Sequence, residues 1–148
     1  MTGPHDARFQ PTPIPMNDTK RVQWVLRIAV AGEFLGHGAF AVGFWVPQKM
    51  QWAGWIQTLI GVDAATAAQL LTLVGISDFL VALIVLVYPI RIVLLWAAFW
   101  GFWTALVRPL VGEPFWDFVE RWANWGAPLA LLVLRGWPVR QARRDWLR

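Results

Sequence analysis

Glu33 and His37 are the residues whose types and spacing most strongly suggest chemistry. They stand four positions apart in the sequence GEFLGHG at positions 32–38, inside an apolar run from Val22 to Val46. On a helix this spacing places both side chains on one face. Charge at that depth in a membrane is costly, so we expect both side chains to face the protein interior and not lipid.

Two interpretations of this pair stay open. A carboxyl group and an imidazole could hold a proton or the headgroup of a quinone, because burial favours their neutral, hydrogen-bonding forms. They could equally form a structural clasp beside a seam of small residues that lets helices approach closely, namely Gly32, Gly36, Ala39 and Gly43. Asp78, near the middle of another apolar segment, would lie at a similar depth if the two segments are antiparallel.

A metal centre has little support in the sequence. The spacing Glu-x-x-x-His differs from the Glu-x-x-His of di-iron bundles, and no second carboxylate–histidine pair occurs. Apart from His5, near the N-terminus, His37 is the only histidine, and there is no cysteine, which argues against bis-histidine haem, thiolate sites and covalently attached haem. We therefore expect no metal and no covalently bound cofactor, and any cofactor would be a quinone.

The composition requires a membrane to hold these groups. Of the 148 residues, 57% are hydrophobic, and most of them fall into four blocks that are each long enough to cross a bilayer. We expect an all-α integral membrane protein, an up-down bundle of four transmembrane helices within residues 20–135. Residues 1–19 are predicted to be a mobile tail and residues 136–148 a basic tail. The predicted spans are Val22–Val46, Ala64–Tyr88, the segment after Arg91 to Leu110, and Phe118–Leu134.

A short segment between the first two spans is predicted to lie in the membrane interface. Gln48–Leu59 is too short and too polar to cross, and its Trp52, Trp55 and Ile56 follow helical spacing. Asp63 could cap the next helix through its side chain. The short turn at Pro89 predicts that spans two and three are antiparallel neighbours.

The distribution of basic residues predicts the orientation. With both termini in the cytoplasm, ten of the thirteen lysines and arginines lie on the cytoplasmic side. Because these residues flank apolar blocks, the net charge of +4 indicates membrane topology and not nucleic-acid binding. The opposite side carries more tryptophan than anchoring requires, which indicates a docking or ligand surface. The residues predicted to bind a partner protein there are Trp52, Trp55, Trp116, Trp122 and Trp125.

Arg108 and Trp100 complete the candidate site. Arg108 could simply extend to the membrane surface, or it could join Thr104 and Glu113 in a polar pocket. Trp96, Trp100 and Trp103 form a stripe that could line a quinone cleft or could only pack against helices and lipid. The candidate set for a polar or quinone pocket is Glu33, His37, Asp78, Trp100 and Arg108.

Five segments carry a resemblance to a known family: GEFLGHG at 32–38, GISD at 75–78, PIR at 89–91, FWGFWTALVRPL at 99–110 and ERWAN at 120–124. In order and spacing they resemble the DoxX-like family of small four-helix membrane proteins. Some relatives are membrane subunits of thiosulfate:quinone oxidoreductases, and others associate with redox or detoxifying enzymes. The resemblance implies a quinone-linked redox membrane and supplies no catalytic residues.

Three function classes follow. The first is an accessory subunit of a redox complex in the bacterial inner membrane, in contact with quinone, lipid and other subunits but without its own electron carrier. The second is a structural scaffold in a larger membrane assembly. The third is a small-molecule transporter, which the absence of an internal repeat disfavours. No nucleophile, P-loop or dinucleotide motif supports catalysis by this chain alone.

Overall fold

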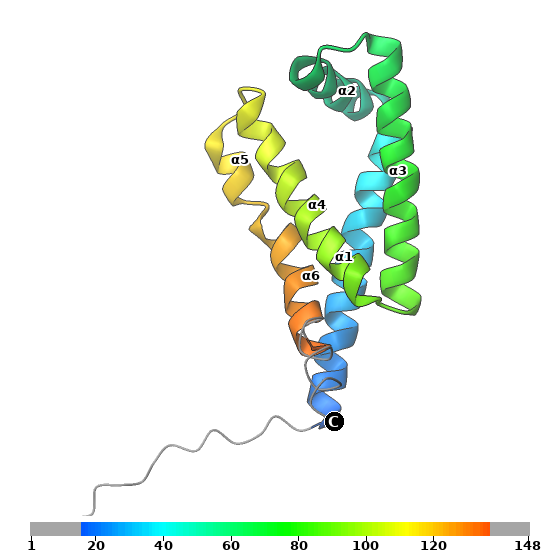
Figure 1. The fold of residues 1–148 in the computed structure, drawn as a ribbon, viewed down its shortest axis with the longest axis vertical. Helices are drawn as coiled ribbons and strands as arrows, with labels where there is room; N and C mark the ends of the chain where they lie inside the picture. The colour runs from blue at the N-terminus through cyan, green and yellow to red at the C-terminus, as the bar shows by residue number, and fades with distance from the viewer. Residues whose placement is uncertain (1–15, 137–148) are drawn as a thin grey trace, which may run out of the picture.

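The computed structural model describes residues 16–136, and all the regular structure in that range is helical. Three of the helices are long and apolar enough to cross a membrane, over Asn17–Val42, Ala64–Val87 and Arg91–Leu110. The chain is therefore a helical membrane protein with three candidate spans in the described range (Figure 1). The helices are α1 (Met16–Val42), α2 (Val46–Ile60), α3 (Ala64–Val87), α4 (Arg91–Leu110), α5 (Phe115–Val119) and α6 (Trp122–Leu134).

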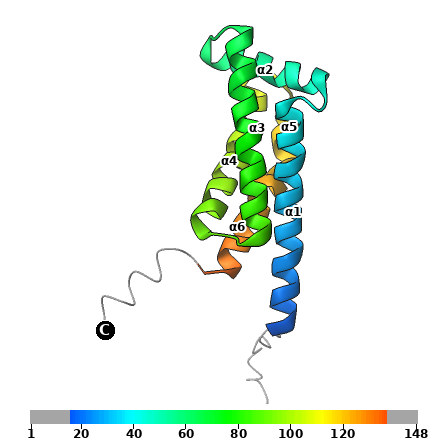
Figure 2. The ribbon, with the colours of Figure 1, turned by 90° about the vertical axis from the view of Figure 1, so that its right-hand side faces the viewer.

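Helices α1 and α3 form the most extensive pair in the fold, and they run antiparallel (Figure 2). The buried positions Ala31, Phe34, Gly38 and Ala41 recur on α1 at spacings typical of a helix–helix seam. A Cβ atom on Gly38 would lie 3.0 Å from the carbonyl oxygen of Gly75, and one on Gly75 would lie 2.9 Å from the carbonyl oxygen of Gly38. The two backbones thus meet where neither residue has a side chain.

This contact corrects the predicted glycine seam. Gly32 and Gly36 are exposed, and a Cβ atom on either would meet nothing within 4 Å. Gly43 lies just beyond α1 with φ +109°, a conformation that favours glycine. The seam runs through Gly38 instead, because packing of Val30 and Phe34 into the core turns the other glycines outward.

The ends of α1 also differ from the prediction. The helix begins at Met16, inside the segment 1–19 that was predicted to be a tail, whereas residues 1–15 and 137–148 lie outside the described range. It ends at Val42 and not at Val46. The N–H groups of Gly43 and Phe44 both donate to the carbonyl of Ala39, at 3.2 and 2.9 Å, which closes the helix by a glycine cap.

The predicted fourth span is not one continuous helix. Turn residues Glu120 and Arg121 separate the five-residue α5 from the thirteen-residue α6. At 1.5 Å per residue α6 alone is about 20 Å long, less than the apolar thickness of a bilayer. It packs closely on α4, where a Cβ atom on Gly101 would lie 2.6 Å from the carbonyl oxygen of Asn124.

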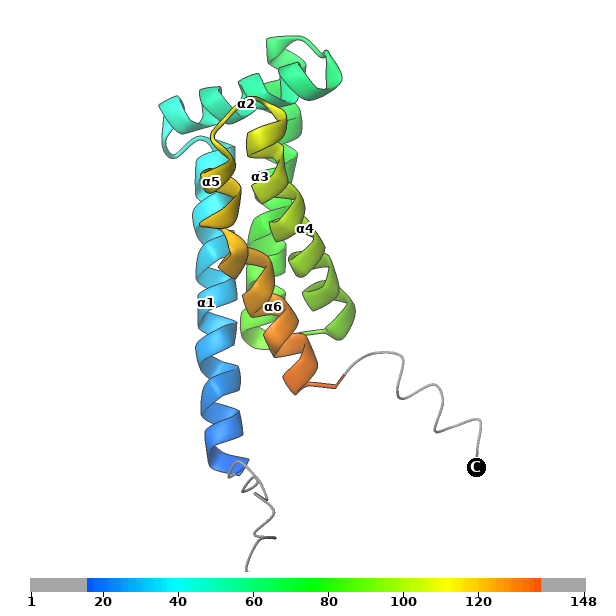
Figure 3. The ribbon, with the colours of Figure 1, turned by 90° about the vertical axis from the view of Figure 1, so that its left-hand side faces the viewer.

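Helices α3 and α4 are antiparallel, as predicted, but they are not close neighbours along their length. They are joined by residues 88–90 and then diverge (Figure 1), since α3 packs mainly on α1 while α4 packs mainly on α6. Helix α2 lies across the wide end of this fork (Figure 3). The arrangement leaves space between α3 and α4, beneath α2.

Basic side chains close the opposite end of the bundle. The Arg27 guanidinium donates to the carbonyl oxygens of Val85 and Val87, at 3.3 and 2.7 Å, and also to the carbonyl oxygen of Leu86. It therefore caps the last turn of α3. Arg91 donates to the carbonyl oxygen of Arg135, just after α6, at 3.1 and 2.7 Å. These bonds satisfy carbonyls that have no partner within their own helix.

The contact between Gly38 and Gly75 should be intolerant of a single methyl group. We expect Gly75→Ala to destabilise the protein by about 1–3 kcal/mol, because the new Cβ would meet the Val42 side chain at 2.8 Å and also the backbone carbonyl oxygen of Gly38 at 2.9 Å, which cannot move aside by a rotamer change. Gly36→Ala is the matched control on α1 and should cost nothing, since its Cβ would project into open space. Thermal unfolding in detergent measures both, and equal midpoints for the two variants would contradict this packing.

Asp63 caps α3, as the sequence predicted. Its carboxylate accepts hydrogen bonds from the Thr66 hydroxyl at 2.6 Å and from the N–H groups of Ala65 and Thr66 at 2.9 and 3.0 Å. The Thr66 hydroxyl, followed by these amides, holds the pKa of Asp63 below its ordinary value. A depressed carboxyl pKa stabilises the fold above the unfolded-state pKa, and that contribution is lost as pH falls through the folded-state value.

Asp63→Asn keeps a capping oxygen but cannot titrate. Wild type should therefore melt above Asp63→Asn at pH 7, and the difference should shrink as pH falls below about 4. Melting curves of both proteins between pH 7 and pH 3 test this, and a difference independent of pH would be the contrary result.

Candidate functional site

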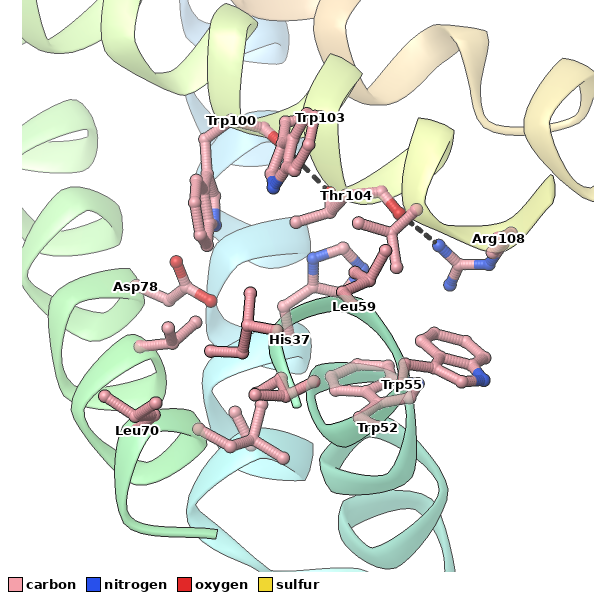
Figure 4. A pocket seen from close by; sticks show the side chains of 16 residues that line it. His37, Trp52, Trp55, Leu59, Leu70, Asp78, Trp100, Trp103, Thr104 and Arg108 are labelled. Carbon is pink, nitrogen blue, oxygen red and sulfur yellow. Dashed lines mark hydrogen bonds between the residues drawn. The ribbon is translucent and has the colours of Figure 1, made fainter. Parts of the chain in front are cut away.

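A cavity of about 300 Å³ lies between α1, α2, α3 and α4 (Figure 4). Its walls are mostly apolar, with aliphatic side chains from α2 and α3 and indoles from α2 and α4. Apart from the indole N–H groups, the polar groups in the lining come from His37, Asp78, Thr104 and Arg108. The divergence of α3 from α4 therefore creates a membrane-level pocket with polar groups from three helices.

Asp78 supplies the carboxylate of this cavity. It lies on the face of α3 that packs against the rest of the bundle, together with Gly75 and Ala82, and is only 3% exposed. The indole of Trp100 projects from α4 on the other side of the cavity, toward Asp78 (Figure 4). Asp78 and Trp100 thus face one cavity from the two walls that the backbone leaves apart.

His37 lies under the indoles of α2. Its ring meets that of Trp52 edge to face, with 5.6 Å between centroids, and Trp52 in turn stacks on Trp55 at 6.3 Å. The Trp52 N–H is buried and has no hydrogen-bond partner among the described residues. Helix α2 therefore covers the imidazole with an aromatic roof.

Arg108 is buried and does not extend to the surface, contrary to the simpler expectation. It is 5% exposed, its Nη1 donates to the carbonyl of Thr104 at 2.8 Å, and its Cζ lies 5.2 Å from the ring centroid of Trp55. Within residues 16–136 no carboxylate lies within ion-pair distance of its guanidinium. A buried cation is thus held by one carbonyl and one indole face.

A second, more polar cavity of about 260 Å³ adjoins the first. The two share a wall made of His37, Trp52, Trp55 and Arg108. The rest of the polar cavity comes from Phe40, Gln48, Gln51, Glu113, Asp117 and Arg121. Gln51 donates to Glu113 at 3.5 Å, which connects α2 to the loop after α4. The glutamines of α2 thus line the polar cavity, its aliphatic side chains line the apolar one, and its tryptophans lie between the two.

Glu33 is the predicted site residue that does not line either cavity. Its Oε1 atom is buried and has no hydrogen-bond partner in the described part of the chain, although its carboxyl group is close enough to Asp78 to interact electrostatically. The expected Glu33–His37 clasp is not formed, because His37 turns toward Trp52. The cavity brings together His37, Asp78, Trp100 and Arg108 and leaves Glu33 beside it.

The predicted docking tryptophans separate into two groups. Trp52 and Trp55 are partly buried and line the cavities, so they are not free surface. Trp116 and Trp122 are 74% and 52% exposed, whereas Trp125 is partly buried against Phe102, with 6.0 Å between ring centroids. Of these five tryptophans, Trp116 in α5 and Trp122 at the start of α6 thus present exposed indoles.

Lys49 is a residue that the sequence-based prediction missed. Its Nζ donates to the carbonyl of Val42 at 3.2 Å and to the hydroxyl of Thr72 at 2.9 Å, which fastens α2 to the end of α1 and to the side of α3, more than two turns after that helix begins. A threonine within the predicted second span, with a lysine in the preceding segment, was the available signal. The role of Lys49 is to hold the roof of the cavity in place.

Residues 16–136 contain no group of three or more His, Asp or Glu side chains arranged to hold a metal ion. Comparison with known proteins identifies no relative: no family model, curated protein or solved structure matches this chain. The chemistry of the two cavities is therefore the basis for assigning a function.

Cysteine labelling should distinguish the two cavities, since the chain has no native cysteine. A charged, water-soluble thiosulfonate should modify Gln51→Cys in the polar cavity, and the uncharged N-ethylmaleimide should modify Val74→Cys in the apolar one. Ala82→Cys, buried in the core away from both, is the control and should stay unmodified. Mass spectrometry reads the result, and equal protection of Val74→Cys and Ala82→Cys would rule out an open cavity.

Proposed function

We propose that this chain is an accessory membrane subunit of a redox complex, and that its apolar cavity binds the headgroup of a quinone. The observation that carries the proposal is the pairing of indole walls with His37 and Asp78 at membrane depth. A quinone headgroup is a flat ring with carbonyl acceptors, so it needs aromatic surface to stack on and a few hydrogen-bonding groups. The chain would supply binding and positioning, and its partner subunits would supply the electron carriers.

The chemistry of the lining residues suits that ligand. The imidazole of His37 can donate to a quinone carbonyl, and the carboxyl group of Asp78 can accept from the hydroxyl of the reduced form. Trp100 and Trp103 offer ring faces from α4. The cavity volume lies at the lower end of the range for small-molecule sites, which is enough for a headgroup whose tail stays in the bilayer.

We also propose that α5 and α6 together complete a fourth crossing of the bacterial inner membrane. Residues 115–134 cover about 20 positions, the length that a crossing needs. The start of α1, the α3–α4 turn and the end of α6 lie at one end of the bundle (Figure 1), and that end carries Lys20, Arg21, Arg91 and Arg135. The positive-inside rule supports cytoplasmic termini. Membership of the DoxX-like family remains part of this proposal.

A scaffold role is the second candidate, and the exposed Trp116 and Trp122 favour it. Exposed indoles at one end of a small membrane protein are suited to docking against another subunit. A transporter would more typically contain two interrupted helices, whereas one interruption, at Glu120–Arg121, is described here. Both alternatives predict that quinone does not bind saturably to the cavity.

Quinone binding is measured by quenching of tryptophan fluorescence in purified protein titrated with decyl-ubiquinone. Wild type should show saturable quenching, and His37→Ala and Asp78→Asn should each weaken binding about tenfold through loss of a hydrogen bond. Trp116→Phe removes an exposed indole outside the cavity and should leave the affinity unchanged. Non-saturable quenching of wild type, or equal affinity in all variants, would reject the quinone site.

The subunit assignment has its own test. Native mass spectrometry of membranes gently solubilised from the source organism should show the chain bound to other proteins. Trp116→Ala combined with Trp122→Ala should release them without lowering the melting temperature, because both side chains are exposed. A chain found by itself, with turnover of its own, would show that it is not an accessory subunit.

A further inference from the structure

Arg108 carries a buried charge that the described residues do not neutralise. Only Nη1 of its guanidinium has a hydrogen-bond acceptor, the carbonyl of Thr104, and no carboxylate reaches it within 4 Å. Burial of an ion without a counter-ion is expensive, and an arginine has five N–H donors to satisfy. The remaining donors therefore call for an acceptor that the chain itself does not supply.

The polar cavity lies beside this guanidinium. Two cations, Arg108 and Arg121, and two carboxylates, Glu113 and Asp117, line it. Arg121 is already engaged, since it pairs with Glu120 and donates to the carbonyl of Asp117 at 2.9 Å. Arg108 is thus the available cation. The carboxylates of Glu113 and Asp117 are near enough to interact with it electrostatically, but they lie beyond ion-pair distance.

We infer that the polar cavity binds a phosphate ester that also carries an ammonium group, as in an aminophospholipid headgroup. The guanidinium of Arg108 would hold the phosphate through the donors that Thr104 leaves unpaired. The ammonium group would face Glu113 and Asp117. A simple anion fits less well, because these two carboxylates would repel it, whereas a zwitterion matches both signs of charge in the wall.

The position of the cavity favours a lipid as the source of this group. The cavity lies beneath α2, at the end of the bundle where α1 and α4 terminate, which is the headgroup level of a bilayer crossed by these helices. The half-exposed Phe40 in its wall offers apolar contact at that level. A volume of about 260 Å³ holds a headgroup and leaves the acyl chains in the membrane.

The site is separate from the proposed quinone cavity, although both use the shared wall of His37, Trp52, Trp55 and Arg108. Its ligand would occupy the side facing Gln51 and Glu113, away from Asp78 and Trp100. A protein that binds no quinone could still bind the lipid. An experiment that rejects the quinone site therefore leaves the lipid site open, and the reverse also holds.

The test uses full-length protein stripped of lipid in dodecyl maltoside. Dioctanoyl phosphatidylethanolamine should raise the melting temperature saturably, and native mass spectrometry should retain one lipid per chain. Dioctanoyl phosphatidylglycerol, which has a phosphate but no ammonium group, should bind at least tenfold more weakly. Stabilisation by soluble phosphoethanolamine at equal concentration would support the same chemistry and assign a soluble source, whereas stabilisation by the dioctanoyl lipid alone assigns a membrane source.

Three variants connect the response to the cavity. Arg108→Gln should lose at least tenfold in phosphatidylethanolamine affinity, whereas Arg21→Gln, an exposed arginine at the other end of α1, should keep the wild-type response. Glu113→Gln should lower the preference for phosphatidylethanolamine over phosphatidylglycerol, and it reports on the site even if Arg108→Gln folds poorly. Equal stabilisation by phosphatidylglycerol or inorganic phosphate, or an unchanged preference in Glu113→Gln, would overturn the inference.

Discussion

The contact between the backbones of Gly38 and Gly75 sets the geometry of the rest of the molecule. It fixes the register of α1 against α3. His37 comes one residue before Gly38, and Asp78 comes three residues after Gly75, so this register places both side chains on walls of the same cavity. Because α3 is held so closely to α1, it cannot also follow α4, which packs through Gly101 on α6. The cavity is the space that these two close pairs leave between them.

Hydrogen bonds from basic residues to backbone carbonyls are the second constraint. In an apolar environment a helix end has no water to satisfy its last carbonyls. Arg27, Lys49 and Arg91 each donate to a carbonyl at or near the end of another helix, and Arg108 donates within its own. In the described residues only two ion pairs accompany them, Asp18–Arg21 and Glu120–Arg121. The cationic residues that indicate topology in the sequence are thus also structural caps.

The sequence predicts well what depends on local rules and less well what depends on packing. Length and hydropathy predicted four spans, of which three are long continuous helices; helical spacing predicted a short helix at Trp52 and Trp55, and side-chain chemistry predicted the Asp63 cap. The prediction of the packing face of α1 was wrong, because small residues occur on several sides of that helix. Only the contact with α3 determines that Gly38 lies in the interface. Burial of Arg108 and the break at Glu120–Arg121 depend on neighbours distant in sequence, and no local pattern distinguishes them.

The two faces of α2 explain why one small protein can hold two kinds of cavity. Its tryptophans and aliphatic residues roof the apolar space, while Gln48 and Gln51 face the polar one. Leu70 and Trp103 line the apolar cavity yet are 37% and 39% exposed, so the cavity opens toward lipid between α3 and α4. The proposed quinone would then enter sideways from the bilayer core, while the proposed lipid headgroup would reach Arg108 from the membrane surface. The shared wall of His37, Trp52, Trp55 and Arg108 would place two such ligands in contact with the same four side chains.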